Sequence, residues 1–358
     1  KAVGAALQQL GRFKEAKSVY LELAHQDPND ARTLFEITQC GPVKADDAVT
    51  QLLVSWSPAN ASHRDRMLIA YARGKADDDL GNFARAKDHF EDANRLADSL
   101  IAVPFERAAY KSSIDRTIET FTKEFFRTYV EFGTPFDRPV FIVGMIRSGT
   151  TLLERLLAAH PLISPGGEIP FWTEHASKLF DKGRLAGPDE SRELVKNYQS
   201  ILDKVSKSGL VTDKMPLNFS VLGVIHLLLP RAKIIHVVRE KRDTMTSIFT
   251  TPHPEPINWA HSWERIDFFY RQYERLTRHW HETLDSSIFC EVRYEDLVRQ
   301  PESVLEILVA FLDLPHDSEI RQEGATKIAT PSKWQARQPV HARSIGRWNH
   351  YPEWFENL

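Results

Sequence analysis

Segment 140–151 constrains the fold of this chain more than any other feature. It reads Val-Phe-Ile-Val-Gly-Met-Ile-Arg-Ser-Gly-Thr-Thr, an apolar run that breaks into a glycine loop. The apolar run predicts a buried parallel strand over 140–143, and the leucines after Thr150 recur at helical spacing. A strand, a glycine loop and a helix in this order point backbone N–H groups and the positive helix end at a bound phosphate. The segment therefore predicts an α/β domain with an anion site.

The loop departs at one position from the pattern of nucleoside triphosphatases. Gly144, Gly149 and Thr151 fit G-x4-G-K-[ST], but Thr150 stands where the lysine belongs. That lysine normally contacts the terminal phosphates of ATP or GTP. The cation of this loop is instead Arg147, which precedes the second glycine. The loop therefore predicts a phosphate-bearing ligand other than a nucleoside triphosphate.

A second anion motif follows an apolar segment that predicts a buried strand over 233–238. Arg239 stands at the carboxyl end of this strand, and Ser247 follows eight residues later. An arginine fork and a serine hydroxyl suit a polyanion in the crevice of an open α/β sheet. The strand also lacks the Asp with which triphosphatases hold magnesium. Taken alone, segment 239–242 could equally be a solvated charged loop.

These motifs resemble those of a known family. Arg147-Ser-Gly-Thr-Thr-Leu152 resembles the 5′-phosphosulfate loop of sulfotransferases that use 3′-phosphoadenosine-5′-phosphosulfate (PAPS). Its context, with Ala159-His160-Pro161 downstream, is similar to the protein-tyrosine sulfotransferases. The resemblance covers roughly residues 136–358 and rests on several motifs in the same order. It implies an α/β P-loop-like sulfotransferase domain, a parallel sheet flanked by helices, with PAPS as the donor co-substrate and no metal.

The resemblance also assigns residues to the donor. The loop that binds the 5′ end corresponds here to Arg147, Ser148, Gly149, Thr150 and Thr151. The family's R-x7-S motif, which holds the 3′-phosphate, corresponds to Arg239 and Ser247. A tyrosine that contacts the nucleotide corresponds to Tyr294, after a predicted strand over 288–292, and a phosphate-contacting cation of the closing segment corresponds to Arg347.

Sulfuryl transfer needs an in-line nucleophile, a base for its proton, and cations for the transferring and leaving groups. Glu168 lies on a Gly/Pro-rich loop and matches the family's general base. Lys214 follows a predicted strand over 209–213 and matches the lysine that stabilises the bridging oxygen of the leaving phosphate. Ser332 matches the active-site serine, and Arg147 completes the predicted catalytic group. Without the flanking motifs, Glu168 and Lys214 would be interpreted as surface residues.

The acceptor site departs from the tyrosine enzymes. They read Gly-Glu-Glu-Thr-Arg around the base, whereas this chain reads Gly-Gly-Glu-Ile-Pro over 166–170. Gly167 replaces an acidic residue, and Pro170 replaces an arginine that helps to hold acidic peptides in the relatives. The resemblance therefore implies a hydroxyl-bearing acceptor and leaves peptide tyrosine, carbohydrate and small molecules open.

The first hundred residues have a different pattern. Leu10-Gly-Arg-Phe13-Lys-Glu-Ala16-Lys-Ser-Val-Tyr20 recurs as Leu80-Gly-Asn-Phe83-Ala-Arg-Ala86-Lys-Asp-His-Phe90. The offset is close to two tetratricopeptide periods of about 34 residues. We therefore predict an all-α tetratricopeptide-repeat domain over 1–106, a linker helix within 107–135, and the sulfotransferase domain over 136–358. The middle repeat is degenerate, further repeats are expected before residue 1, and the repeats could bind a protein partner.

Composition narrows the remaining possibilities. The net charge of −3 gives no sign of a nucleic-acid partner. Cys40 and Cys290 are far apart, which excludes a disulfide scaffold or a cysteine-rich zinc site. His279 and His281 lie on different faces of a predicted helix and cannot both bind one metal ion. No apolar run approaches the ~20 residues of a membrane span, so a cytoplasmic location is the default expectation.

Two other functions stay open at this stage. A P-loop kinase predicts dependence on ATP and magnesium, although its lysine and carboxylate are missing here. A repeat scaffold with an inactive nucleotide domain predicts nucleotide binding without turnover, or no binding. The intact set of predicted donor and catalytic residues favours the sulfotransferase.

Overall fold

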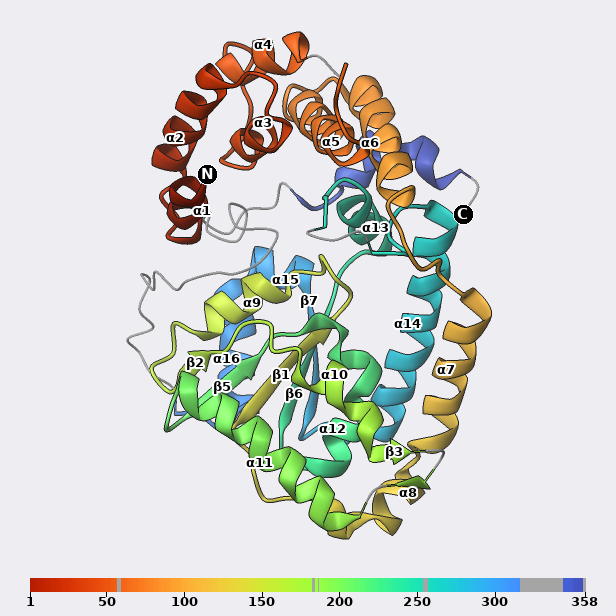
Figure 1. Ribbon diagram of the computed structural model, residues 1–358. Coiled ribbons are helices and arrows are strands. Elements are labelled where there is room, and N and C mark those ends of the chain that lie inside the picture. The colour runs from red at the N-terminus through yellow and green to blue at the C-terminus, as the bar shows by residue number, and fades with distance from the viewer. Residues whose placement is uncertain (57–58, 182–183, 186, 254–256, 316–343, 357–358) are drawn as a thin grey trace. The chain divides into compact units, whose positions relative to one another are not determined.

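The computed structural model describes residues 1–56, 59–181, 184–185, 187–253, 257–315 and 344–356 (Figure 1). The chain divides into two compact units. The first comprises Lys1–Phe105, Glu240–Phe269 and the described part of Lys327–Leu358. The second comprises the described parts of Glu106–Arg239 and Tyr270–Thr326.

The second unit contains a sheet of five parallel strands. Their order across the sheet is β2-β5-β1-β6-β7. The strands are β1 (Pro139–Gly144), β2 (Ile163–Pro165), β5 (Leu210–Asp213), β6 (Lys233–Val238) and β7 (Phe289–Arg293). The four strands predicted from the sequence are thus all present, and the predicted parallel sheet flanked by helices is confirmed.

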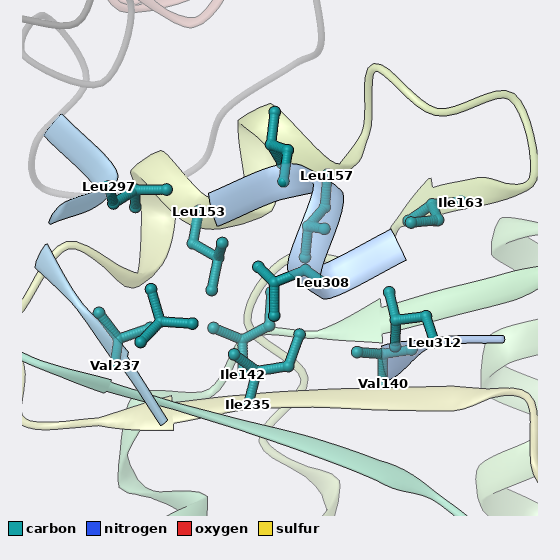
Figure 2. Packing of buried hydrophobic residues seen from close by; sticks show 12 residues of the cluster. Val140, Ile142, Leu153, Leu157, Ile163, Ile235, Val237, Leu297, Leu308 and Leu312 are labelled. Carbon is teal, nitrogen blue, oxygen red and sulfur yellow. The ribbon is translucent and has the colours of Figure 1, made fainter. Parts of the chain in front are cut away.

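Helices cover both faces of this sheet. One face packs against α9 (Thr150–Leu157), α15 (Tyr294–Arg299) and α16 (Pro301–Phe311). Figure 2 shows the resulting core, in which Ile142 and Ile235 of the strands meet Leu153 and Leu308 of the helices. Because side chains alternate along a strand, Phe141 points to the other face, where it stacks on Tyr198 at a centroid distance of 6.0 Å.

That other face carries α11 (Pro188–Val205), α12 (Leu222–Leu228) and the part of α14 (Trp263–Thr283) that belongs to this unit. Its side chains include Trp280 of α14, whose indole N–H donates to the carbonyl of Phe219 at 2.8 Å. Further elements of this unit are α7 (Arg107–Thr120), α8 (Lys123–Thr128), α10 (Phe171–His175), β3 (Phe180–Asp181) and β4 (Arg184–Leu185).

The first unit is helical in its described residues. Its helices are α1 (Ala2–Gln9), α2 (Phe13–Gln26), α3 (Ala31–Thr38), α4 (Ala48–Ser55), α5 (His63–Asp79), α6 (Phe83–Asp98) and α13 (Lys241–Phe249). The all-helical N-terminal segment expected from the sequence is therefore present. Among the residues that the structure describes, no helix is long and apolar enough to cross a membrane.

The repeated sequence corresponds to a repeated local structure. Helices α1 and α2 form one hairpin, and α5 and α6 form another. Gly11 and Gly81 occupy the two turns with φ of 79° and 78°, a left-handed conformation that favours glycine. Ala16 and Ala86 follow at equivalent positions, and both are fully buried. The sequence repeat therefore encodes two copies of the same helical hairpin.

A second pair of glycines allows the two helices of each hairpin to approach closely. A Cβ atom on Gly4 would lie 2.5 Å from the ring of Tyr20, and one on Gly74 would lie 2.8 Å from the ring of Phe90. These two glycines were not predicted from the sequence, because the repeated motif does not indicate which face of the first helix meets the aromatic residue.

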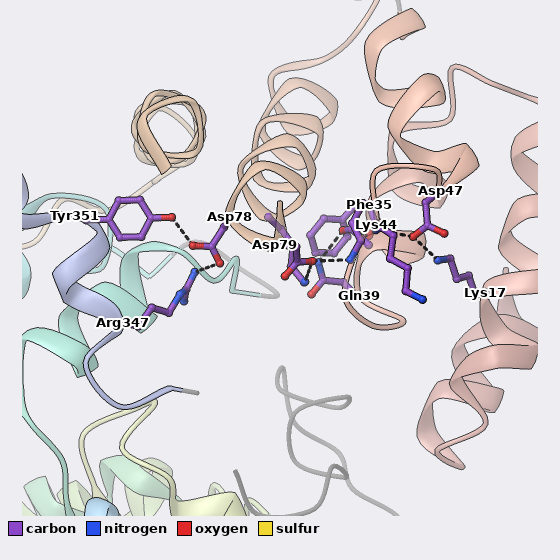
Figure 3. A network of polar contacts seen from close by, with 12 residues as sticks. Lys17, Phe35, Gln39, Lys44, Asp47, Asp78, Asp79, Arg347 and Tyr351 are labelled. Carbon is purple, nitrogen blue, oxygen red and sulfur yellow. Dashed lines mark hydrogen bonds and ion pairs between the residues drawn. The ribbon is translucent and has the colours of Figure 1, made fainter. Parts of the chain in front are cut away.

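The C-terminal residues of the first unit contact α5 through a polar network. Asp78 accepts a hydrogen bond from the Tyr351 hydroxyl at 2.5 Å and pairs with Arg347 at 3.0 Å; Figure 3 marks both contacts with dashed lines. The neighbouring Asp79 accepts from the backbone N–H of Val43 at 2.8 Å. Two consecutive aspartates of α5 therefore bind two segments that are distant in the sequence, one at Val43 and one at 347–351.

We predict that Gly74→Ala destabilises the chain by about 1–3 kcal/mol, because the added methyl group would collide with a buried ring. In a helix without this collision, alanine would stabilise by about 0.5–1 kcal/mol. Urea unfolding of Gly74→Ala, Phe90→Leu and the double variant measures the coupling. The alanine should cost less in the Phe90→Leu background, and equal costs in both backgrounds would contradict the collision.

Candidate functional site

Each strand of the parallel sheet leads at its carboxyl end into one of the predicted functional segments. In the order of the strands across the sheet, these are Glu168 after β2, Lys214 after β5, the glycine loop after β1, Arg239 after β6 and Tyr294 after β7. Because carboxyl ends of parallel strands meet at one edge, residues distant in the sequence converge there. This edge is the candidate active site.

The glycine loop has a backbone conformation that few other residues would allow. Gly149 is the N-cap residue of α9 with φ of 104°, and a Cβ atom there would lie 2.3 Å from the ring of Tyr294. Arg147 is not a glycine but also has a positive φ, of 70°. Such strained positions concentrate at functional sites. The loop therefore holds its backbone close to Tyr294 at a cost in local strain.

The hydroxyl groups of the loop are shielded from solvent. Ser148 is 1% exposed, and among the described residues its Oγ has no hydrogen-bond partner. Thr150 is also buried, and Thr151 is partly buried. Buried polar atoms without partners are rare, and the first N–H groups of a helix favour an anion. These features fit a phosphate or sulfate group bound at the start of α9.

Arg239 connects the loop with Tyr294. Its Nη1 donates to the carbonyl oxygen of Arg147 at 3.0 Å, and its Cζ lies 4.7 Å from the centroid of the Tyr294 ring. Tyr270 in turn donates to the carbonyl oxygen of Arg239 at 3.2 Å. Three of the residues predicted to bind the donor therefore lie in direct contact.

Glu168 and Lys214 form an ion pair, with 2.5 Å between Lys214 Nζ and Glu168 Oε1. The Lys214 side chain is fully buried, whereas that of Glu168 is 36% exposed. A buried ammonium group requires such a partner, because its desolvation costs several kcal/mol. The predicted base and the predicted lysine thus form one unit, a pairing that the sequence did not reveal.

Residues 139–318 match the family model described as "Sulfotransferase family". This chain belongs to the sulfotransferase family. An uncharacterized protein of Aquifex aeolicus (strain VF5) is 27% identical over 97% of this chain and 48% of its own length. The protein-tyrosine sulfotransferase 1 of Danio rerio is 26% identical over 62% of this chain and 70% of its own. The chain thus spans about half the length of the first of these relatives, and the predicted resemblance is confirmed.

The solved structures to which this chain is similar include a sulfotransferase domain from the curacin biosynthetic pathway. It has a TM-score of 0.41 and 19% sequence identity, and it covers 59% of this chain and 96% of its own. The sulfotransferase of Alicyclobacillus acidocaldarius has a TM-score of 0.40 and 20% identity over 60% of this chain and 95% of its own.

At this edge of the sheet, Glu154 of α9 binds the loop that carries Glu168. Glu154 Oε1 accepts from the Thr212 hydroxyl at 2.7 Å and from the Gly167 N–H at 3.0 Å. Burial raises the pKa of Glu154, an effect that Lys214 and Thr212 partly offset. The role of Glu154 was not predicted, although an acidic residue on the buried face of an apolar helix indicates a buried polar contact.

Asp213, which precedes Lys214, was also missed. It is fully buried, and Tyr198 donates its hydroxyl hydrogen to Asp213 Oδ2 at 2.8 Å. Burial raises the pKa of Asp213 to about 7, despite the opposing hydrogen bonds from Tyr198 and the Met215 backbone. Two buried carboxyl groups, those of Glu154 and Asp213, thus accompany the ion pair of Lys214 and Glu168, and burial raises the pKa of both.

The remaining predicted residues belong to the first unit or lie outside the described residues. Ser247 is buried in α13. Arg347 pairs with Asp78 and donates from Nη1 to the Thr250 hydroxyl at 2.9 Å. Ser332 lies outside the described residues.

We predict that Glu154→Ala destabilises the chain by about 1–3 kcal/mol, because it leaves the Gly167 N–H and the Thr212 hydroxyl without their acceptor. Glu154→Gln keeps one carbonyl oxygen at this position and should restore most of the loss. Urea unfolding gives the energies, and hydrogen exchange of segment 163–170 reports the loop. Unchanged exchange in Glu154→Ala would show that Glu154 does not hold the loop.

The titration of Asp213 predicts a pH dependence of stability. Its pKa rises from 3.8 in the unfolded chain to about 7 in the folded one, so the folded state retains a proton that the unfolded state releases. The free energy of unfolding should therefore fall as the pH rises from about 4 to about 7. Asp213→Asn removes this titration and should flatten the decline, which urea unfolding across this range measures. Parallel curves for the two proteins would contradict the assignment.

Proposed function

We propose that this chain transfers the sulfuryl group of PAPS to a hydroxyl group of an acceptor. The observation that carries the proposal is the order of groups along one sheet edge. Glu168 and Lys214 follow two neighbouring strands, the anion loop follows the central strand, and Arg239 and Tyr294 follow the next two. A base, a cation and two anion-binding elements in a row match the needs of in-line group transfer.

The donor requires binding groups for two anionic ends. The loop offers backbone N–H groups and the hydroxyls of Ser148, Thr150 and Thr151 for the 5′ end. Arg239 has the planar fork that suits the 3′-phosphate, and its contact with the Arg147 carbonyl keeps it beside the loop. Ser247, Tyr294 and Arg347 complete the proposed donor set. Bound PAPS supplies the activated sulfuryl group.

In the proposed reaction the acceptor oxygen forms a bond to sulfur while the bond between sulfur and the bridging phosphate oxygen breaks. Glu168 takes the acceptor proton, and its partial exposure leaves it accessible to a substrate. Lys214 orients this carboxylate and stabilises the leaving oxygen. Arg147 and Ser332 are the other proposed stabilising groups, and no metal ion takes part.

The finer features of the proposal concern the acceptor and the repeats. A peptide tyrosine, a carbohydrate hydroxyl and a small-molecule hydroxyl are all acceptors to test, because Pro170 stands where the tyrosine enzymes have an arginine that helps to hold acidic peptides. We further propose tetratricopeptide repeats over 1–106 with a protein partner, a linker over 107–135, a catalytic domain over 136–358, and a cytoplasmic location.

We predict metal-independent binding of 3′,5′-ADP, the desulfated product, in calorimetric titrations, and no comparable binding of Mg-ATP. Arg239→Ala should weaken the binding free energy of the bisphosphate by about 1.5–3 kcal/mol, which corresponds to the loss of a charged hydrogen bond. The matched control is Arg231→Ala, an exposed arginine before the amino end of the same strand, which should bind as the wild type does.

Labelled PAPS with an acceptor panel then tests the chemistry. Glu168→Gln should retain 3′,5′-ADP binding and lose transfer, which separates a catalytic role from a binding role. A preference for Mg-ATP would favour a kinase, and binding without transfer to any acceptor would favour an inactive scaffold.

A further inference from the structure

A second cluster of ionisable side chains lies on the face of the sheet that α14 covers. His236 of β6 and Glu291 of β7 are opposite each other in the parallel register, and His281 comes from α14. One ligand atom from each of the three lies within 4.8 Å of the others. The proposed transfer reaction uses none of these residues.

Short distances join the cluster. Glu291 Oε2 lies 2.8 Å from His281 Nε2 and 3.3 Å from His236 Nδ1. In a tetrahedral zinc site with bonds of about 2.0–2.1 Å, neighbouring ligand atoms are separated by about 3.3 Å. The cluster therefore needs only small side-chain movements to surround a metal ion.

A buried tyrosine orients the first of these ligands. The second ring nitrogen of His236, Nε2, lies 2.6 Å from the hydroxyl oxygen of Tyr273. His236 and Tyr273 are 2% and 3% exposed. Histidine ligands of metals usually have such a partner for the other ring nitrogen, because it fixes the ring orientation. This contact leaves Nδ1 of His236 directed at Glu291.

The ligand types also suit a metal ion, because imidazole nitrogens and a carboxylate oxygen bind divalent transition metals. His236 Nδ1 is buried and has no hydrogen-bond partner among the described residues, so a ligand atom directed at Glu291 is available to an ion.

We propose that His236, His281 and Glu291 bind a divalent transition-metal ion, with Zn²⁺ the best match. Two imidazoles and one carboxylate are zinc ligands, and water completes a tetrahedron. His281 and Glu291 are 42% and 38% exposed in their side chains, so an ion has access from solvent. The ion would tie the edge strand β7 to β6 and α14. This site is structural and separate from sulfuryl transfer.

The test uses the chain without a polyhistidine tag after treatment with a chelator. Titration calorimetry with Zn²⁺ should give one site per chain, and Zn²⁺ should raise the melting temperature. Co²⁺ should produce the intense visible absorption of a tetrahedral centre. His281→Ala and Glu291→Gln should each weaken Zn²⁺ affinity by at least about 10-fold. Tyr273→Phe should weaken the affinity by about 10-fold, because the His236 ring loses the partner that orients it.

His25→Ala is the matched control, because it removes an exposed imidazole from the first unit and should leave Zn²⁺ affinity unchanged. Equal Zn²⁺ affinity in the wild type and His281→Ala would overturn the proposal, as would a Co²⁺ spectrum without tetrahedral bands. Binding of 3′,5′-ADP is a separate measurement, so failure of the metal site leaves the proposed function untouched.

Discussion

The parallel pairing of β1 with both β5 and β6 is the constraint on which the site depends. Parallel neighbours cannot be joined by a tight turn, so each connection must cross over and return to the same starting edge. Every strand then ends at the opposite, carboxyl edge of the sheet, and the loops that follow the strands lie there. Residues as distant in the sequence as Gly149 and Tyr294 meet there, and the absence of a side chain at Gly149 permits the close approach.

The buried charge of Lys214 organises the other half of this edge. An isolated ammonium group at this depth would be strongly disfavoured, so the fold supplies Glu168 at 2.5 Å. Asp213 and Glu154 lie nearby, and burial raises the pKa of both. Burial disfavours a negative charge on these two groups, whereas the Glu168 carboxylate is partly exposed and pairs with Lys214.

Much of this arrangement could be predicted from sequence because it depends on local signals. Strands β1 and β6 are continuous apolar runs, and the glycine loop after β1 has a recognisable residue order. The features that could not be predicted from the sequence depend on which residues face one another in the fold. His236 and Glu291 come together only through the register of β6 and β7, and Glu154 acts on a loop that follows another strand. No sequence period encodes either relation.

The loop between β2 and α10 shows how backbone geometry and substrate choice become linked. Gly167 has φ of 72°, its N–H donates to Glu154, and its carbonyl oxygen accepts from the Lys214 N–H at 2.8 Å. A Cβ atom at this position would meet no atom within 4 Å, so the preference for glycine comes from backbone conformation and not from space. The acidic residue of the tyrosine enzymes is therefore replaced here by one that supports a left-handed turn. Glu168, the next residue, pairs with the buried Lys214, so the substitution that removes an acidic residue also supports the turn that carries this ion pair.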